Sequence, residues 1–242
     1  MTISEMHYDF KVKLDKVASQ TKEDFNVAEI DWLLNEAQDV FIKQRYGLNN
    51  PHRTGFEVTQ KRIDDLSSLH VKQPEQVGIT PTLTSGVYEV PLSSLTHTYL
   101  FYTRGSVDVT VTNCPTTTMQ LRHIQADDLS DALRDPFNQS SITDGVLFNF
   151  GKSSGNLATT SIYIYPGTLT LGDVYIEYIK HPRQMFFGTY TYIDGSTTTL
   201  TNCELPEHTH SEMVDQAVLI ASGIIEHPTY QQMKKQKVFN QE

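Results

Sequence analysis

A strongly apolar helix near the C-terminus constrains the fold of this chain more than any other stretch. Residues 205–228 contain a proline near each end: Pro206 suits the first turn of a helix, and Pro228 cannot continue one. Thr209 and Glu212 have the spacing of a capping box, so the helix can also begin at Thr209. Its apolar residues recur at spacings of three and four, which predicts one wide apolar face. They are Met213, Val214, Ala217, Val218, Ala221, Ile224 and Ile225. Such a face has to be buried, so the rest of the chain must supply a partner.

The clearest partner is a second amphipathic segment, Phe25 to Tyr46, more than 150 residues earlier. Asn26 with Glu29 predicts an N-terminal cap, and Asp31 is interpreted as a further acidic group that complements the helix dipole. We also expect a shorter helix from about Phe56 to Leu69. Residues 6–20 remain open between strand, helix and extended arm, because apolar residues alternate from Tyr8 to Leu14.

The composition changes at Gly86, and the sequence up to Cys203 is rich in Thr, Tyr, Val and Ile with frequent turn residues. This pattern is typical of an all-β region. Asp194-Gly195 predicts a hairpin turn, and a short helix is expected from Ala126 to Arg134. The candidate strands are Val87–Leu92, Thr98–Arg104, Ser106–Thr112, Thr117–Ile124, Val146–Asn149, Ser161–Tyr165, Val174–Lys180, Phe187–Ile193 and Thr197–Cys203.

These elements predict an α+β fold in which N- and C-terminal helices form a bundle around an inserted antiparallel β domain, sandwich- or barrel-like. The expected divisions are residues 1–85 for an N-terminal arm, bundle helices and an aperiodic linker, 86–203 for the β domain, and 204–242 for the last bundle helix and a polar tail.

The charge balance argues against a sequence-reading nucleic-acid module. The formal net charge is −10, whereas binding to phosphate backbones needs clustered Lys and Arg. The densest basic cluster is Lys234, Lys235 and Lys237. No apolar run reaches the ~20 residues of a membrane helix, so no membrane association is expected.

Phosphate loops and dinucleotide fingerprints are absent from the sequence. Cys203, His208 and His210 do not have a zinc spacing and are interpreted as a buried thiol and polar residues of a helix start. The aspartates of the short helix are interpreted as a solvated face; they are Asp127, Asp128, Asp131 and Asp135. We therefore expect no enzyme, no catalytic residue, no metal and no cofactor.

Both ends of the chain resemble virion structural proteins of tailed phages, above all the crAss-like group. The opening pattern is F-K-x-K-L-x-K-x-x-S followed by E-I-D-x-x-L-N-E-A-Q-x-x-F-I. Here it falls on Phe10, Lys11, Lys13, Leu14, Lys16 and Ser19, then on Glu29, Ile30, Asp31, Leu34, Asn35, Glu36, Ala37, Gln38, Phe41 and Ile42. The C-terminal stretch matches at Leu205, Pro206, His210, Glu212, Val214, Asp215, Ala217, Val218 and Ala221.

The resemblance implies a head-to-tail connector subunit, that is, an adaptor or ring protein beneath the portal. It implies homo-oligomeric rings, commonly twelve-fold, that contact the portal and adjacent tail or ring proteins. DNA would pass through the ring with non-specific contacts, and the protein would reside in the neck or tail of the virion after assembly in the host cytoplasm. A tail-tube or tail-terminator ring is the nearest alternative. A carbohydrate-binding or hydrolytic tail-fibre accessory would instead use exposed tyrosines and paired carboxylates.

Six residues are candidate partner contacts. Trp32 falls off the main apolar stripe of its predicted helix, so it can cover a second partner. The polar tail combines basic and aromatic or apolar residues that suit a docking arm, namely Tyr230, Lys234, Lys235, Val238 and Phe239.

Overall fold

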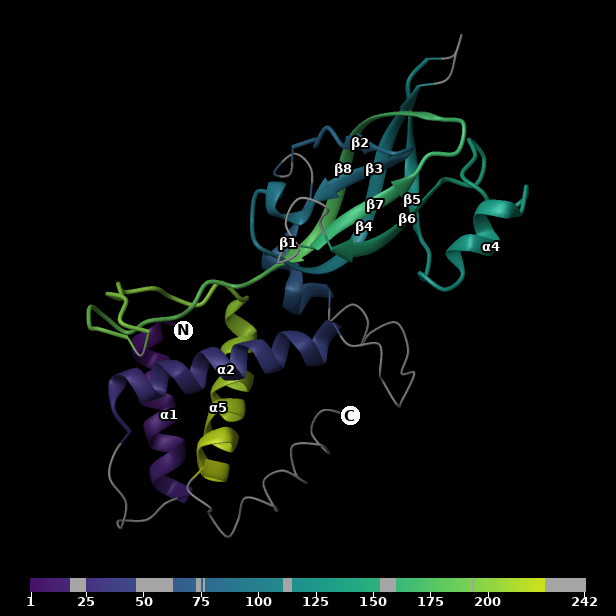
Figure 1. Cartoon of the computed structure of the whole chain (residues 1–242). Coiled ribbons are helices and arrows are strands. Elements are labelled where there is room, and N and C mark those ends of the chain that lie inside the picture. Colours follow the sequence, from purple (N-terminus) through teal and green to yellow (C-terminus); the bar gives the residue numbers. More distant parts are fainter. Residues whose placement is uncertain are drawn as a thin grey trace. The chain divides into compact units, whose positions relative to one another are not determined.

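The chain forms two compact units in a computed structural model (Figure 1). One unit comprises residues 1–69 and 182–242, and the other comprises residues 70–181. The structure describes residues 1–17, 25–46, 63–72, 75, 77–110, 115–152, 160–192 and 194–224. The compact units divide the chain at 69/70 and 181/182, whereas the predicted boundaries are at 85/86 and 203/204.

Three long helices build the first unit: α1 (Ile3–Val17), α2 (Val27–Tyr46) and α5 (His210–Ile224). The apolar face of α5 packs against both α1 and α2. Figure 1 shows α2 running across the other two helices. The pairing of the chain ends is thus present, whereas the bundle geometry stays a prediction.

Residues 6–20, left open by the sequence, begin inside helix α1. Its start is a capping box: the Thr2 N–H donates to Glu5 Oε2 at 2.8 Å, and Thr2 Oγ1 accepts the Glu5 N–H at 3.3 Å. The alternation from Tyr8 to Leu14 is therefore not that of a strand.

The start of α5 differs from the predicted capping box. A 3-10 turn, η3 (Glu207–Thr209), precedes the helix, and Thr209 Oγ1 donates to the carbonyl of Pro206 at 2.8 Å. Glu212 pairs with Arg45 of α2. The Thr209 N–H donates to the Pro206 carbonyl at 3.0 Å, whereas a capping box would donate it to Glu212. The N-terminus of α2 agrees with its prediction, since the Asn26 N–H donates to Glu29 Oε2 at 2.7 Å.

The predicted helix from Phe56 to Leu69 is described only in its last part. Residues 63–66 are helical and lead into η1 (Ser67–Leu69). Within the described residues, no helix is both long and apolar enough to cross a membrane.

The second unit is one curled eight-stranded sheet in the order β1-β8-β4-β5-β6-β7-β3-β2. The strands are β1 (His70–Val71), β2 (Thr82–Thr84), β3 (Val87–Pro91), β4 (Tyr99–Thr110), β5 (Thr117–His123), β6 (Val146–Lys152), β7 (Thr160–Tyr165) and β8 (Thr170–Lys180). A further 3-10 turn, η2 (Leu92–Ser94), follows β3. Burial alternates along part of β7, where Ile162 and Ile164 are buried, whereas four consecutive residues of β6, Val146–Asn149, are buried.

The sheet is mixed, which corrects the predicted antiparallel domain. β5 and β6 pair in parallel, with Leu121 opposite Val146 and His123 opposite Phe148. The cause is the connection through residues 124–145, which carries the short helix α4 (Leu129–Arg134) and returns the chain in the same direction.

The predicted linker at residues 71–85 is also part of the sheet. It supplies β2, and Ile79 forms an antiparallel bridge with Val174 of β8 through two backbone hydrogen bonds of 2.9 Å. This bridge brings the chain next to β2 back onto β8, so the sheet curls on itself.

Two predicted strands, Thr98–Arg104 and Ser106–Thr112, are joined into the single strand β4. Gly105 continues the strand, and a Cβ there would lie 2.9 Å from Leu121 Cδ1, so this side chain of β5 would have to shift. The register against β8 shifts on either side of this point.

The last two predicted strands, Phe187–Ile193 and Thr197–Cys203, do not join the sheet. The described residues between 182 and 203 belong to the helical unit, where isolated bridges connect Phe186 with Thr201 and Thr191 with Thr197. We refer to residues 186–201 as the hairpin loop. The α+β class is confirmed, and in the sequence the residues of the sheet fall between the two parts of the helical unit.

Candidate functional site

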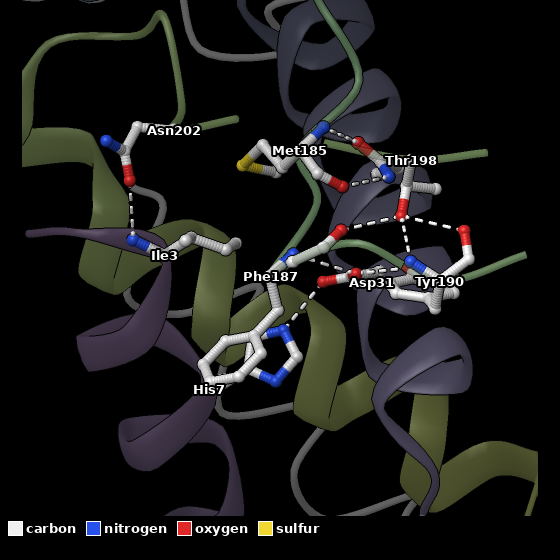
Figure 2. Close-up of polar contacts among 10 residues, drawn as sticks. Ile3, His7, Asp31, Met185, Phe187, Tyr190, Thr198 and Asn202 are labelled. Carbon is white, nitrogen blue, oxygen red and sulfur yellow. Dashed lines mark hydrogen bonds and ion pairs between the residues drawn. The ribbon is translucent and has the colours of Figure 1, made fainter. Parts of the chain in front are cut away.

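The most developed polar cluster of the helical unit is centred on Asp31 of α2 (Figure 2). Its carboxylate is fully buried. His7 Nε2 of α1 lies 2.7 Å from Oδ1, the Phe187 N–H donates to Oδ2 at 3.0 Å, and the Tyr190 hydroxyl also donates to Oδ2. One side chain thus ties together α1, α2 and the hairpin loop.

Further hydrogen bonds hold the segment that carries the hairpin loop onto the helices. Asn35 of α2 pairs with the backbone of Met185, donating to its carbonyl at 3.0 Å and accepting its N–H at 2.8 Å. Asn202 Oδ1 accepts the Ile3 N–H at 3.0 Å, as Figure 2 shows. Inside the loop, buried Thr198 accepts the Tyr190 N–H at 3.0 Å. Hydrogen bonds therefore hold the chain on both sides of the hairpin loop and also connect residues within it.

The electrostatics of the cluster favour a structural role. Burial, with the hydrogen bond to Asp31, raises the pKa of Tyr190 far above its usual range, so the hydroxyl stays protonated and donates. His7 and Asp31 are a histidine–carboxylate pair of the kind that enzymes use, but both are buried and the Phe187 ring lies 4.8 Å from that of His7. A substrate cannot reach the pair, so its geometry suits an anchor.

A second buried carboxylate, Asp65, contacts α2 and η3 directly and is linked to α5 through Arg45. Arg45 Nε of α2 lies 2.8 Å from Oδ2, and His208 Nε2 of η3 lies 2.8 Å from Oδ1. Arg45 also pairs with Glu212 of α5. His208, which lies just before α5, is thus held against the Asp65 carboxylate.

The three residues considered as metal ligands have separate partners. His208 contacts Asp65, and His210 Nε2 lies 2.9 Å from the carbonyl of Leu205. Cys203 is half-buried, and burial raises the pKa of its thiol to about 11. Across the described residues, no three His, Cys, Asp or Glu side chains gather in a way that could hold a metal ion.

Of the predicted partner contacts, the structure describes only Trp32. Its side chain is 40% exposed on α2, next to buried Asp31 but on the outward side of the helix. Tyr230, Lys234, Lys235, Val238 and Phe239 lie outside the described residues.

An open groove of about 520 Å³ lies on the helical unit beside α1. It is lined by Met1, Ser4, Glu5, Tyr8, Asp9 and Ser211. Tyr8 is 73% exposed there, although α1 buries its opposite face. An open groove with an exposed aromatic ring suits contact with another protein better than an enclosed small-molecule site.

The Asp31 anchor was not predicted from the sequence. Asp31 was assigned to the helix dipole, yet the residue stands between Ile30 and Leu33 on a face that is mostly apolar. A carboxylate at such a position is almost always hydrogen-bonded when buried, which was the available signal. Its partners at positions 187 and 190 are too distant in the chain to be found by local pattern.

Comparison with known proteins gives one informative match. No curated protein matches the chain. The family model described as phage tail ring protein 3/4, of the crAss ring group, matches residues 1–235 and so includes the helices, the sheet and most of the tail. With nearly its whole length matched, the chain belongs to the family of phage tail ring proteins 3/4.

Proposed function

We propose that this ring protein is a subunit of the connector that joins the capsid portal to the tail. The family consists of structural ring proteins of phage tails, so the chain is a structural component of the virion. The connector position, the portal as neighbour and the passage of DNA through the ring are the proposal.

The observation that carries the proposal is that exposed apolar side chains occur on both compact units. Tyr8 and Trp32 are exposed on the helical unit, and Phe137 is 87% exposed on the β unit. A ring closes when one patch of each subunit meets a different patch of the next. In the proposal, these exposed side chains contribute to the two halves of such a contact.

We assign the contacts between neighbours to Trp32 and to the tail that carries Tyr230, Lys234, Lys235, Val238 and Phe239. Trp32 is a large ring that α2 presents outward while Asp31 fixes the helix from within. Tryptophan is enriched among the residues that dominate interface energies. The terminal helices form the packing element of the ring in this proposal.

The acidic charge supports a channel for DNA. A formal net charge of −10 repels phosphate groups, so DNA can pass a ring of such subunits without adhering. Contacts with DNA are then few and independent of its sequence.

The decisive experiment is imaging of the virion neck at side-chain resolution. We expect the chain as a closed ring of twelve copies in the stack between portal and tail. Another copy number would correct only the stoichiometry. A virion in which the chain is absent from the neck would overturn the connector position.

A ring further along the tail is the second candidate. It is favoured by the description of the family, which names the tail and not the portal. The same images separate the two positions, because a tail ring would touch tail proteins on both of its faces.

A further inference from the structure

The connection between β5 and β6 leaves unusual apolar surface exposed. A helix that links two parallel strands normally packs on the sheet and buries its apolar face. Here no residue of α4 is buried. Leu133 is 40% exposed, Phe137 87% and Ile142 55%. These side chains are apolar, as side chains in buried contacts usually are, but here they are exposed.

The turn that presents Phe137 is firmly built. Asp135 accepts the Phe137 N–H at 3.0 Å and the side-chain amide of Asn138 at 2.5 Å, and Arg122 of β5 donates to the Asn138 carbonyl. A partner that binds here would not have to order this turn first. Pre-ordered surfaces of this kind lose less entropy on association.

The same connection is strongly acidic. Residues 124–145 contain five aspartates and a single basic residue, Arg134. Asp127, Asp128 and Asp131 are exposed, as are the apolar side chains of this connection. A matching partner therefore combines apolar or aromatic side chains with closely spaced positive charges.

One stretch of this chain has that composition. Residues 234–237 are the only four-residue window of the sequence with three basic residues. Tyr230 precedes this window, and Val238 and Phe239 follow it directly.

From this match we infer that the crossover surface of one copy receives residues 229–242 of a neighbouring copy. The crossover surface is defined as Asp127, Asp128, Asp131, Leu133, Phe137 and Ile142. The 18 residues after Ile224 can span at most about 60 Å, which is enough to reach a neighbour. Donor and acceptor surfaces differ, so every copy gives one tail and receives another, as ring closure requires. The inference rests on the proposed ring and names the contact that closes it.

Cross-linking of the full chain tests the contact directly. Phe137 is replaced by p-benzoylphenylalanine, a substitution that its exposure permits, and protein of natural isotope content is mixed with ¹⁵N-labelled protein before ring assembly. After illumination, we expect mixed-isotope peptide pairs that join position 137 to residues 229–242.

The matched variants exchange acidic and basic residues between the two surfaces. Each is made in the protein that carries p-benzoylphenylalanine at position 137. Asp127→Lys with Asp131→Lys, or Lys234→Glu with Lys235→Glu, is expected to lower the yield of these pairs at least tenfold. Combining all four substitutions restores the wild-type net charge and is expected to return the yield to within about twofold. The control is Lys72→Glu with Lys152→Glu, which reverses two exposed lysines of the β unit outside the crossover surface and is expected to leave the yield unchanged.

The outcomes separate this inference from the proposed function. Rings with mixed-isotope pairs between position 137 and the tail support it. The inferred contact is overturned when rings form but cross-links at position 137 are absent, join other residues or lie within one copy. The proposed ring is then unaffected. A chain that forms no ring in vitro or in virions contradicts both.

Discussion

A single buried carboxylate organises the helical unit at the scale of residues. Asp31 is fully buried, and its oxygens satisfy a histidine, a backbone N–H and a tyrosine hydroxyl from two distant parts of the chain. Burial of a charge is costly unless hydrogen bonds replace its water. The three donors do so here, which makes the position intolerant of change.

Asp31→Ala is expected to lower the free energy of unfolding by about 3–5 kcal/mol, because buried His7, the part-buried Phe187 N–H and the part-buried Tyr190 hydroxyl would lose their acceptor. Urea unfolding followed by circular dichroism measures the change. Asp127→Ala, at an exposed aspartate, serves as the control and is expected to change stability by less than about 0.5 kcal/mol. Equal effects of the two substitutions would contradict the anchoring role.

The thiol of Cys203 offers a test by pH. Burial raises its pKa to about 11, so the reactive thiolate is scarce at pH 8 and increases as the pH rises toward 11. Alkylation by iodoacetamide at pH 8 is expected to be about 100-fold slower than for an exposed cysteine of pKa near 9. Peptide mapping by mass spectrometry follows Cys203 separately from Cys114. Rapid labelling of the folded protein at pH 8 would argue against this burial.

At the scale of elements, the sequence predicted what local pattern determines. Helices α2 and α5 follow from apolar spacing and terminal prolines or caps, and most strands follow from alternation. The sequence did not decide between strand, helix and arm for residues 6–20, because apolar residues alternate from Tyr8 to Leu14 and obscure the helical spacing of the buried residues. The buried residues are Ile3, Met6, Phe10 and Leu14, at helical spacing, and Tyr8 is exposed.

The remaining differences come from contacts between distant residues. The parallel pairing of β5 and β6 depends on where the crossover returns, which no local pattern encodes. The hairpin loop has strand-like composition, but Asp31 binds it to the helices instead of the sheet, and Asn35 binds Met185 directly before it. The tail contacts and the role of Trp32 stay predictions, and only chemical composition argues for them.

Glycine at the start of β6 gives a prediction for the sheet. Gly145 has φ of +89°, and a Cβ there would lie 2.7 Å from the backbone oxygen of Gln120. Gly145→Ala therefore combines backbone strain with a clash against β5, and we expect a loss of about 2–4 kcal/mol in the free energy of unfolding.

Gly86 provides the matched control for Gly145. Its φ is +83°, but a Cβ there meets nothing within 4 Å, so Gly86→Ala should cost only about 1 kcal/mol. Chemical denaturation of both variants gives the comparison. Similar losses would show that β5 yields to the added methyl group.

At the scale of the whole molecule, the β unit contains its own core. The buried cluster of the sheet runs from Val71 to Tyr178 and lies entirely within residues 70–181. We therefore propose that these residues fold without the helices. The fragment 70–181 is expected to unfold cooperatively on heating with a β-type circular dichroism spectrum. A fragment without a thermal transition would show that the sheet depends on the helical unit.

Ring assembly is the property that depends on the outside of both units, and Trp32 is the residue on which we expect it to depend most clearly. Its side chain is 40% exposed, so its removal costs the isolated subunit little packing, while an interface would lose a large aromatic contact. Trp32→Ala is expected to reduce the yield of assembled rings at least tenfold, equivalent to about 1.4 kcal/mol or more per contact, with a thermal midpoint within a few degrees of wild type. Leu83→Ala, at an exposed apolar residue of β2, is the control and should assemble normally. Mass photometry and particle images count the rings. Normal assembly of Trp32→Ala would move the interface to another face of the helical unit, whereas loss of both assembly and thermal stability would show that Trp32 supports the fold instead of the ring.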